Sequence, residues 1–311
     1  ALRLLSIVLF SLSATASIAQ VAPPATQDKT KQIWQLLDYL AVDYGRSVKE
    51  GQVASEAEYA EMQEFAQAAE RQLAELPATP AAPTLASDAA ELRALIAQKA
   101  SAASVGEQAR KLAGGLIAAY PVSMAPGKLP DLQRGATLYQ SQCASCHGVS
   151  GHADGPLAAK LNPPPIALAD HERARERSVF ALQQIITRGV AGTSMPGFVQ
   201  LSDEDRWALA YFASTLSYSE ADQQAGAKLW TAQPALREVV PSLAALSQHA
   251  EAVLAKTVGA DAARQLTAYL RSTPQLLATS NTGSVQIAKD KLRDSVVAMD
   301  NGNERLASQL A

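Results

Sequence analysis

The sequence contains two cysteines, and both lie in the five-residue motif Cys143-Ala144-Ser145-Cys146-His147. Two thiols at this spacing can each form a thioether with one vinyl group of a porphyrin, and an imidazole directly after the second thiol can bind the iron. The motif predicts one covalent haem c with His147 as proximal ligand. A thioredoxin-like redox pair has the same cysteine spacing but requires a βαβ setting, which is not seen around these residues. A structural disulfide would leave His147 unexplained.

The composition of the chain favours helices. Hydrophobic residues make up 48% of the 311 residues and aromatic residues 5%, alanine is abundant, and the alternation typical of strands is almost absent. A chain of this length corresponds to about two domains. The net charge of −3 and the lack of a basic stripe argue against nucleic-acid binding. We therefore expect an all-α fold and no nucleic-acid partner.

The N-terminus has the pattern of an export signal. Arg3 supplies a positive charge, residues 4–12 form an apolar run broken only by serine, and Ser17-Ile18-Ala19 fits a cleavage site. We expect residues 1–20 to be a signal peptide that directs the protein to a bacterial periplasm, and an uncleaved membrane anchor is the alternative. Export agrees with haem attachment, which takes place on the outer side of the energy-transducing membrane.

The remaining sequence shows no stretch of about 20 apolar residues, so we expect no transmembrane helix there. The chain begins with alanine rather than methionine, and Ala311 lies within an expected helix that has no cap. Both features suggest a fragment of a longer protein.

The pattern of apolar residues and breakers divides the chain into three parts after the signal. Residues 21–122 are expected to form an N-terminal helical bundle, residues 128–218 a haem domain, and residues 219–311 a C-terminal helical region. Residues 21–29 and 121–130 are expected to be linkers. The expected helices begin at residue 30 and then cover 55–76, 87–103, 106–119, 132–142, 178–188, 203–217, 219–231, 242–256, 259–271 and 282–311.

A low-spin electron-transfer haem usually needs a second axial ligand, and Met195 is the best candidate. It lies 48 residues after His147 in a loop, and Pro196 stiffens that loop. A neutral thioether favours ferrous iron and raises the reduction potential relative to two histidines. The alternatives are methionines in helical patterns, which are expected to be core residues, and histidines expected in solvated loops or on a helix surface; they are Met62, Met124, Met299, His152, His171 and His249.

Several neighbours are expected to support the haem. A carbonyl of Pro163 or Pro164 should accept a hydrogen bond from the other ring nitrogen of His147, unless the prolines only form a stiff surface turn. Arg188 is expected either to reach a haem propionate or to remain a solvated cation at a helix end. Gly135 should allow close approach of the entry and exit helices, whose expected packing residues are Leu138, Tyr139, Trp207 and Tyr211.

The middle segment resembles a class I cytochrome c. The matching text is Gly135-x-x-Leu138-Tyr139, Cys143-x-x-Cys146-His147-Gly148, Met195-Pro196 and the helix of residues 203–217 with Trp207. This match covers just under a third of the chain. The resemblance implies an all-α domain whose helices wrap one haem, and one-electron transfer between redox partners.

The order of the segments is similar to the periplasmic front half of bacterial fusions of cytochrome c with a high-affinity iron permease. The bundle opens with the text Gln32-Ile33-Trp34-Gln35-Leu36-Leu37-Asp38-Tyr39-Leu40-Ala41-Val42-Asp43-Tyr44, and the haem segment and a second helical stretch follow. The resemblance implies periplasmic or membrane redox partners, iron ions, and a permease fused at the C-terminus. The Arg-Glu-x-x-Glu motif of the permease part does not occur in residues 1–311.

That resemblance implies that ferrous iron is oxidised near the membrane while the haem carries the electron away. Oxygen donors suited to Fe³⁺ are present in the bundle, and the alternative is that these side chains form the solvated faces of helices. The candidates are Asp38, Asp43, Glu56, Glu58 and Glu61, with Tyr39, Tyr44 and Tyr59 beside them.

Other functional interpretations remain open. The haem domain could serve a periplasmic dehydrogenase, with the flanks as docking surfaces, or the helical regions could bind a metal or a partner while the haem acts as a sensor. A peroxidase needs an open distal site, against which Met195 argues. No nucleophile–base pair or phosphate-binding loop stands out, so the chain is expected to be an electron carrier without a catalytic site of its own.

Overall fold

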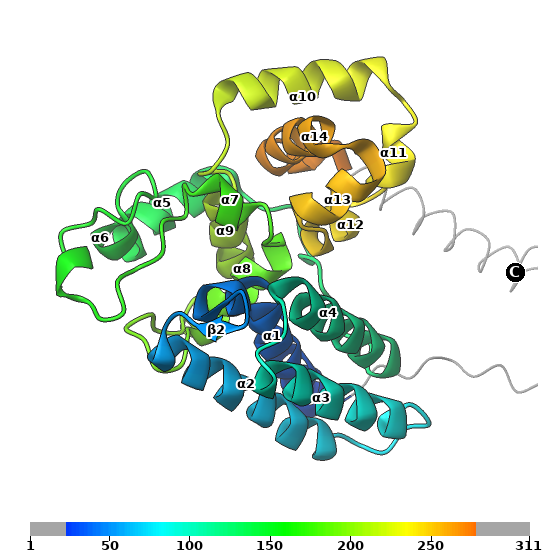
Figure 1. The fold of residues 1–311 in the computed structure, drawn as a ribbon. Coiled ribbons are helices and arrows are strands. Elements are labelled where there is room, and N and C mark those ends of the chain that lie inside the picture. The colour runs from blue at the N-terminus through cyan, green and yellow to red at the C-terminus, as the bar shows by residue number, and fades with distance from the viewer. Residues whose placement is uncertain (1–22, 278–311) are drawn as a thin grey trace, which may run out of the picture.

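The computed structural model describes residues 23–277. The expected signal peptide and the helix expected at 282–311 lie outside the described residues. Within this range the protein is mostly helical, with one two-stranded antiparallel sheet, β1 (Val48–Lys49) and β2 (Gln52–Val53). The expected all-α fold is confirmed. Figure 1 shows three groups of helices: α1 to α4 at the bottom, α5 to α9 in green, and α10 to α14 at the top.

The first group is a four-helix bundle. Its helices are α1 (Pro24–Ser47), α2 (Glu56–Ala74), α3 (Ala82–Ala97) and α4 (Ala102–Ala119). Helix α1 packs against both α2 and α4, and Ile33, Leu37 and Leu40 of α1 are fully buried. The serines that precede α2 and α4, Ser55 and Ser101, accept hydrogen bonds from backbone N–H groups in the first turn of each helix.

Three bundle helices begin earlier than expected, and in two of them, α1 and α3, a proline lies in the first turn. Helix α1 starts at Pro24, inside the stretch expected to be a linker, and α3 starts at Ala82, just before Pro83. The fixed φ of proline suits a first turn, where its missing N–H has no partner within the helix. The prolines therefore mark helix starts here rather than breaks.

The second group carries the candidate haem residues. It contains α5 (Leu132–Gln142), α6 (Ala144–His147), the 3₁₀ turn η1 (Ala158–Lys160), α7 (His171–Ala174), α8 (Val179–Arg188) and α9 (Asp203–Ala213). Helix α5 crosses α9 closely: a β-carbon added to Gly135 would lie 2.2 Å from the carbonyl oxygen of Ala208. The four residues expected to pack these helices together are buried, as predicted: Leu138, Tyr139, Trp207 and Tyr211.

The third group is built around the pair α10 (Glu220–Ala232) and α14 (Ala260–Ser272). Gly226 allows their close contact, since an added β-carbon would lie 2.0 Å from the carbonyl oxygen of Gln265. The prediction of one helix over 242–256 is wrong, because the chain turns at His249 and Ala250 and forms two helices. The shorter elements are α11 (Leu236–Val239), α12 (Leu243–Gln248), α13 (Glu251–Val258) and the 3₁₀ turn η2 (Pro274–Leu277).

The turn between α12 and α13 is stabilised by the haem-domain segment. The N–H of Ala252 donates to the carbonyl of Arg175, and the buried carboxylate of Glu251 accepts a hydrogen bond from the Tyr218 hydroxyl at 2.9 Å. These long-range contacts give partners to the Ala252 N–H and the Glu251 carboxylate at the start of α13. Among the described helices, none is both long and apolar enough to cross a membrane.

Candidate haem-binding site

The cysteine motif forms a single helical turn between two elements. Helix α5 ends at Gln142, Cys143 caps it, and α6 covers the next four residues. The N–H groups of Cys146 and His147 donate to the carbonyl of Cys143 at 3.1 and 2.9 Å. Residues three and four apart in a helical turn share a face, so Cys143, Cys146 and His147 lie on the same side of it. Both cysteines are free and half-buried, so this donor set suits a covalently attached haem.

A backbone carbonyl orients the His147 imidazole. Its Nδ1 lies 2.9 Å from the carbonyl oxygen of Ile166, which leaves Nε2 for a metal. Burial lowers the pKa of His147, and this favours the neutral form that binds metals. The expected acceptor, Pro163 or Pro164, is wrong. The acceptor is Ile166, the first residue after the three prolines, because the proline run carries the chain past the imidazole before a carbonyl faces it.

The loop after His147 packs against the back of α6. The N–H of Ala153 donates to the carbonyl of His147 at 2.8 Å, and the N–H of Leu157 donates to that of Ser145 at 2.9 Å. Gly155 permits this contact, since an added β-carbon would lie 2.5 Å from the carbonyl oxygens of Ala144 and Ser145. The motif is therefore held between α5 and a close-packed loop, which limits its movement.

The protonation of Cys143 argues against a reactive redox pair. Burial, together with the neighbouring Cys146, raises the pKa of the Cys143 thiol to about 12. Redox-active cysteines of the thioredoxin type instead have a lowered thiol pKa and lie at a helix that follows a strand. Cys143 lies between two helices, α5 and α6. Its environment therefore does not match that of a thioredoxin-type cysteine.

Met195 lies in the loop that returns from α8 to α9. Its side chain is partly buried and packs against the core. The N–H of Val190 donates to the carbonyl of Met195 at 3.1 Å, and the N–H of Met195 donates to the Thr193 hydroxyl at 3.1 Å. The N–H of Phe198 closes the loop onto Ile186 of α8 at 2.8 Å. Hydrogen bonds within the Met195 loop, residues 189–198, and to α8 therefore fix its backbone.

The competing methionines occupy other environments. Met62 is a core residue of the bundle on α2, as expected. Met124 is also buried but lies in the connection between α4 and α5 rather than in the expected helical pattern. Met299 falls outside the part of the chain that the structure describes.

The competing histidines also have other contacts. His152 is exposed and hydrogen-bonds to the side chain of Ser150, in agreement with a solvated loop. His171 differs from that expectation, because it begins α7 and its Nε2 lies 3.3 Å from the buried Glu251 carboxylate. His249 ends α12 with a buried Nδ1 that has no hydrogen-bond partner, so it is not simply a residue on a helix surface.

Arg188 contacts the bundle. Its guanidinium donates to the backbone carbonyl of Asp28 at 3.0 Å and lies 3.8 Å from the Asp28 carboxylate. It is therefore not the fully solvated cation of one expectation, because α1 extends further toward the N-terminus than the sequence pattern indicated. A contact with a haem propionate stays a prediction.

The acidic residues proposed for iron are not gathered into a metal site. Asp38 and Asp43 both form ion pairs with Arg177, and Asp43 also pairs with Arg173 at 2.7 Å. Glu56 and Glu58 lie in the exposed first turn of α2. No group of three or more His, Cys, Asp or Glu side chains within residues 23–277 is arranged to hold a metal ion.

The tyrosines expected beside these acids are also distributed differently. Tyr44 is buried, and its hydroxyl has no partner, whereas the Tyr59 hydroxyl donates to the carbonyl of Ile96 at 2.9 Å. Tyr39 lies against Arg177, whose guanidinium carbon is 5.4 Å from the ring centroid. Burial, followed by the nearby Asp43 and Glu61 carboxylates, raises the pKa of Tyr39 to about 12.

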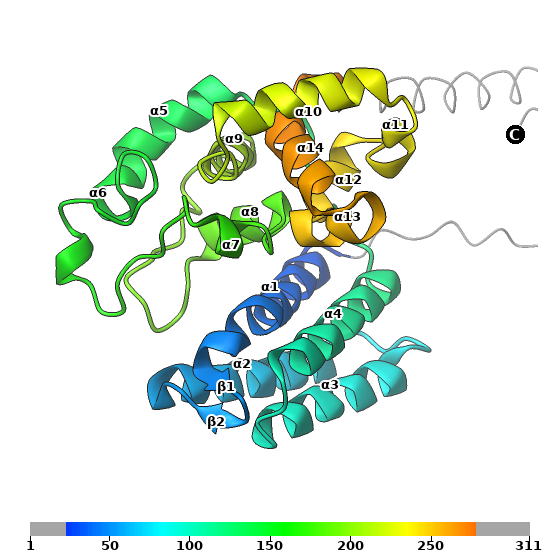
Figure 2. The same cartoon turned by 45° about the horizontal axis from the view of Figure 1, so that its top comes forward.

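The residues that join the bundle to the second group of helices, α5 to α9, were not found from the sequence. Arg173 and Arg177 are nearly buried at this junction, with 9% and 6% of their side chains exposed. Trp34 of α1 meets Phe180 of α8 with ring centroids 4.7 Å apart. A run of charges at 171–177 was the available signal, and such a run normally indicates a solvated face. Figure 2 shows α1 passing beneath α7 and α8.

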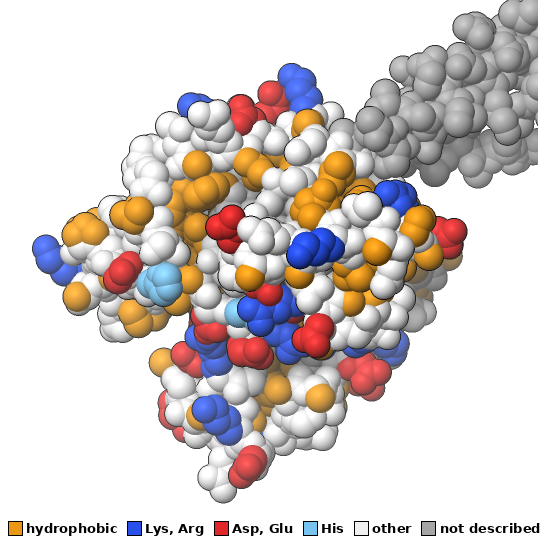
Figure 3. Space-filling model, turned by 90° about the horizontal axis from the view of Figure 1, so that it is seen from above, with side chains coloured by type: hydrophobic (Ala, Val, Ile, Leu, Met, Phe, Trp, Pro, Cys, Tyr) orange, Lys and Arg blue, Asp and Glu red, His pale blue; other side chains and the backbone are white. Residues whose placement is uncertain are grey.

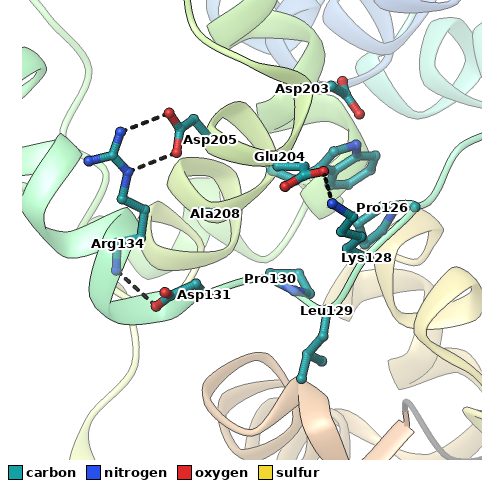
Figure 4. A pocket seen from close by; sticks show the side chains of 12 residues that line it. Pro126, Lys128, Leu129, Pro130, Asp131, Arg134, Asp203, Glu204, Asp205 and Ala208 are labelled. Carbon is teal, nitrogen blue, oxygen red and sulfur yellow. Dashed lines mark hydrogen bonds and ion pairs between the residues drawn. The ribbon is translucent and has the colours of Figure 1, made fainter.

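The cavity in Figure 4 is separate from the candidate haem residues. It has a volume of about 210 Å³ and lies between the linker and the starts of α5 and α9. Arg134 pairs with Asp205 at 2.8 Å, and Lys128 pairs with Glu204 at 2.6 Å across its rim. Cys143, Cys146, His147 and Met195 do not line it. Its ion pairs connect the linker and α5 to α9.

The surface near the motif carries exposed apolar side chains. Val149 and Leu157 follow α6 and are 69% and 43% exposed, and Val199 follows the Met195 loop at 71%. Charged side chains of both signs gather in the middle of the face in Figure 3, with hydrophobic side chains on either side. This mixed surface agrees with the small net charge of −3.

Comparison with known proteins finds two family models that match separate parts of the chain. Residues 130–212 match the family model described as cytochrome c oxidase, cbb3-type, subunit III, and residues 23–123 match the iron permease-associated four-helix bundle domain. The cbb3-type cytochrome c oxidase subunit FixP of Azorhizobium caulinodans is 29% identical over 121 residues. That match covers 39% of this chain and 36% of the relative.

A solved chain of the reducing HAO-like protein complex of Kuenenia stuttgartiensis is 26% identical, over 37% of this chain and 59% of that chain. The TM-score of 0.28 is too low for an argument about the overall fold. The family matches and the arrangement of helices lead to one conclusion about identity: the chain contains a cytochrome c domain similar to subunit III of cbb3-type oxidases, joined to an iron permease-associated four-helix bundle domain.

Proposed function

We propose that the protein is a periplasmic one-electron carrier that holds one haem c on Cys143, Cys146 and His147, with Met195 as the second iron ligand. The observation that carries this proposal is the arrangement of the motif. Two free thiols share a helical face with an imidazole, and the hydrogen bond of its Nδ1 to Ile166 leaves Nε2 available. The haem, when bound, supplies iron that alternates between the ferrous and ferric states.

The residues around the site have defined roles in this proposal. His147 is oriented by Ile166, and the thioethers fix the porphyrin to α6. Met195 presents a neutral sulfur from a loop whose backbone bonds lower the cost of ordering it. Because a thioether stabilises the ferrous state, Met195 as a ligand would raise the reduction potential of the haem.

The electron donor in this proposal is ferrous iron, taken as a substrate. The support is the iron permease-associated bundle at residues 23–123, which packs directly on the cytochrome domain through α1 and α8. A haem held by Cys143, Cys146, His147 and Met195 would accept the one electron that each ferrous ion loses on becoming ferric. The electron then leaves to a respiratory acceptor, and the similarity to an oxidase subunit supports this destination. The membrane partner is an iron permease.

The ligand assignment is tested by the Met195→Ala variant. We expect the ferric wild-type protein to show the weak far-red absorption band of sulfur-to-iron ligation, and we expect the variant to lack it while keeping its covalent haem. A wild-type spectrum without that band removes Met195 as ligand. Met124→Ala, a buried methionine away from the motif, is the matched control and should retain the band.

Coupling to iron is tested by anaerobic mixing of the ferric protein with Fe²⁺ and a ferric chelator. We expect the haem to become reduced with a stoichiometry of one ferrous ion per haem, and ascorbate should reduce the same sample as a positive control. Reduction by ascorbate without reduction by Fe²⁺ would contradict the iron coupling and leave the electron-carrier role in place.

A further inference from the structure

The Met195 loop begins at a residue whose backbone faces the bundle. Gly189 ends α8 with a φ of +73°, and an added β-carbon would lie 2.4 Å from the carbonyl oxygen of Met195. Gly197 is equally tight, with an added β-carbon 2.7 Å from the carbonyl oxygen of Thr187. The two ends of the loop are thus packed backbone to backbone, and a displacement of Gly189 would be transmitted to Met195.

A side chain of the bundle holds Gly189 in place. The Nε2 of Gln35, on α1, donates to the carbonyl of Gly189 at 3.2 Å. The adjacent Arg188 donates to the carbonyl of Asp28 at 3.0 Å, and Asp28 lies about two turns before Gln35 on α1. On the other side of the loop, a β-carbon on Gly192 would lie 3.9 Å from the Oε1 of Glu61, on α2. Two bundle helices therefore border the loop.

Helix α1 is itself fixed to the cytochrome domain next to these contacts. Trp34, the residue before Gln35, packs edge-on against Phe180 of α8, and Asp38 forms its ion pair with Arg177 one turn further on. Because both neighbours are anchored, Gln35 reaches Gly189 from a rigid helix, and its amide can restrain the loop rather than follow it.

From these contacts we infer that Gln35 is a positioning residue for the Met195 ligand, so that the iron permease-associated bundle sets how firmly the methionine is held on the haem iron. This inference rests on the proposed ligand assignment. It gives the bundle a second role besides any contact with iron or a permease, because a partner that displaces α1 would weaken the methionine ligation and change the haem's reduction potential.

The test is displacement of Met195 by imidazole in the ferric holoprotein, followed by absorbance. Gln35→Leu removes the amide donor at similar size, and Gln35→Glu replaces it by acceptor oxygens. We expect imidazole to bind both variants about fivefold more tightly than the wild type, the change that corresponds to about 1 kcal/mol for one hydrogen bond. The matched control is Gln32→Leu, an exposed position one turn earlier on the same helix, which should leave the affinity unchanged.

Thermal unfolding of the same proteins separates positioning from general stability. A residue with only a structural role would lower the melting temperature without changing the relative affinity for imidazole. Imidazole affinities within twofold of the wild type in both Gln35 variants would overturn the inference. A wild type without the sulfur band would instead overturn the Met195 assignment, so the two failures are distinguishable.

Discussion

Gly135 decides how closely two helices of the cytochrome domain can pack. It lies on α5 opposite Ala208 and Phe212 of α9, and the space for a β-carbon is taken by a backbone oxygen at 2.2 Å. A backbone atom cannot move as a flexible side chain can, so any larger residue must push the helices apart. The same two helices carry the buried Tyr139 and Trp207, and α5 leads directly into the haem motif.

We predict that Gly135→Ala destabilises the protein by about 2 to 3 kcal/mol through overpacking. Denaturant unfolding of the holoprotein measures this. Gly114→Ala is the control, because Gly114 is an exposed position inside α4 with no atom within 4 Å of an added β-carbon. The control should be stabilised by about 0.5 to 1 kcal/mol, since alanine favours helix. Equal stability of the two variants would contradict the close crossing.

At this scale the sequence is informative where chemistry needs particular side chains. Cys143, Cys146 and His147 are recognisable because the requirement for two thiols and an imidazole falls within five residues. Ile166 could not be predicted, because its contribution is a backbone carbonyl, which every residue carries. The contact of Gln35 could not be predicted either, because its partner Gly189 lies 154 positions away. The ligand roles of the four haem residues stay predictions.

Helix α2 carries a row of carboxylates on its exposed to half-buried side. Glu58, Glu61 and Glu64 recur every three residues, so they lie near one another on the helix surface. Burial first, and then the charges of Glu58, Asp43 and Glu64, raise the pKa of Glu61 above its ordinary value of 4.5. Folding therefore favours the protonated carboxyl, and this stabilising contribution, present below the ordinary pKa, is lost as the pH rises through the raised pKa.

We predict that Glu61→Gln raises the melting temperature at neutral pH and has no effect below about pH 4, where the wild-type carboxyl is already protonated. Thermal unfolding across this pH range is the measurement. Glu107→Gln, at an exposed position on α4, is the matched control and should show no such dependence. A gain that is the same at both pH values would show that the charge of Glu61 is not its cause.

Helix starts with a capping side chain were predictable, and boundaries set by tertiary contacts were not. The helices expected from residues 55, 178 and 203 begin at or directly after Ser55, Ser178 and Ser202, and each of these serines accepts a backbone N–H there. The break between α12 and α13 depends on Arg175 and Tyr218, which are far away in the sequence. Local propensity cannot encode such a partner, so the residues 242–256 looked like one helix.

The three helix groups meet at the segment of residues 171–177. The side chain of Arg177 pairs with Asp38 and Asp43 of the bundle, and its carbonyl accepts a hydrogen bond from Arg271 of α14 at 2.9 Å. His171 and Arg175 face Glu251 of α13. Residues from separate parts of the chain are thus tied to one short segment, and this explains why the whole arrangement could not be derived from local patterns.

We predict that Arg177→Ala destabilises the protein by about 3 to 5 kcal/mol, because it leaves the buried Asp43 and the half-buried Asp38 without this partner. Far-UV circular dichroism should follow the helices and Soret absorbance the haem domain during denaturant unfolding. The two signals should coincide in the wild type and separate in the variant.

The control for this variant is Arg93→Ala. Arg93 is 52% exposed and pairs with Glu70 on the bundle surface, a contact worth about 0 to 1 kcal/mol. If Arg177→Ala were no more destabilising than Arg93→Ala, and its two signals still coincided, the buried ion pairs would not hold the bundle on the cytochrome domain.

The proposed electron transfer depends on a covalent haem at the cysteine motif. Intact-mass analysis tests directly whether that haem is attached. The protein should be produced in a host that attaches haem c, denatured, and weighed. We predict a red protein whose polypeptide carries the mass of one haem, and a Cys143→Ala, Cys146→Ala double variant that carries none. A colourless wild-type protein with the mass of the bare polypeptide would contradict the account.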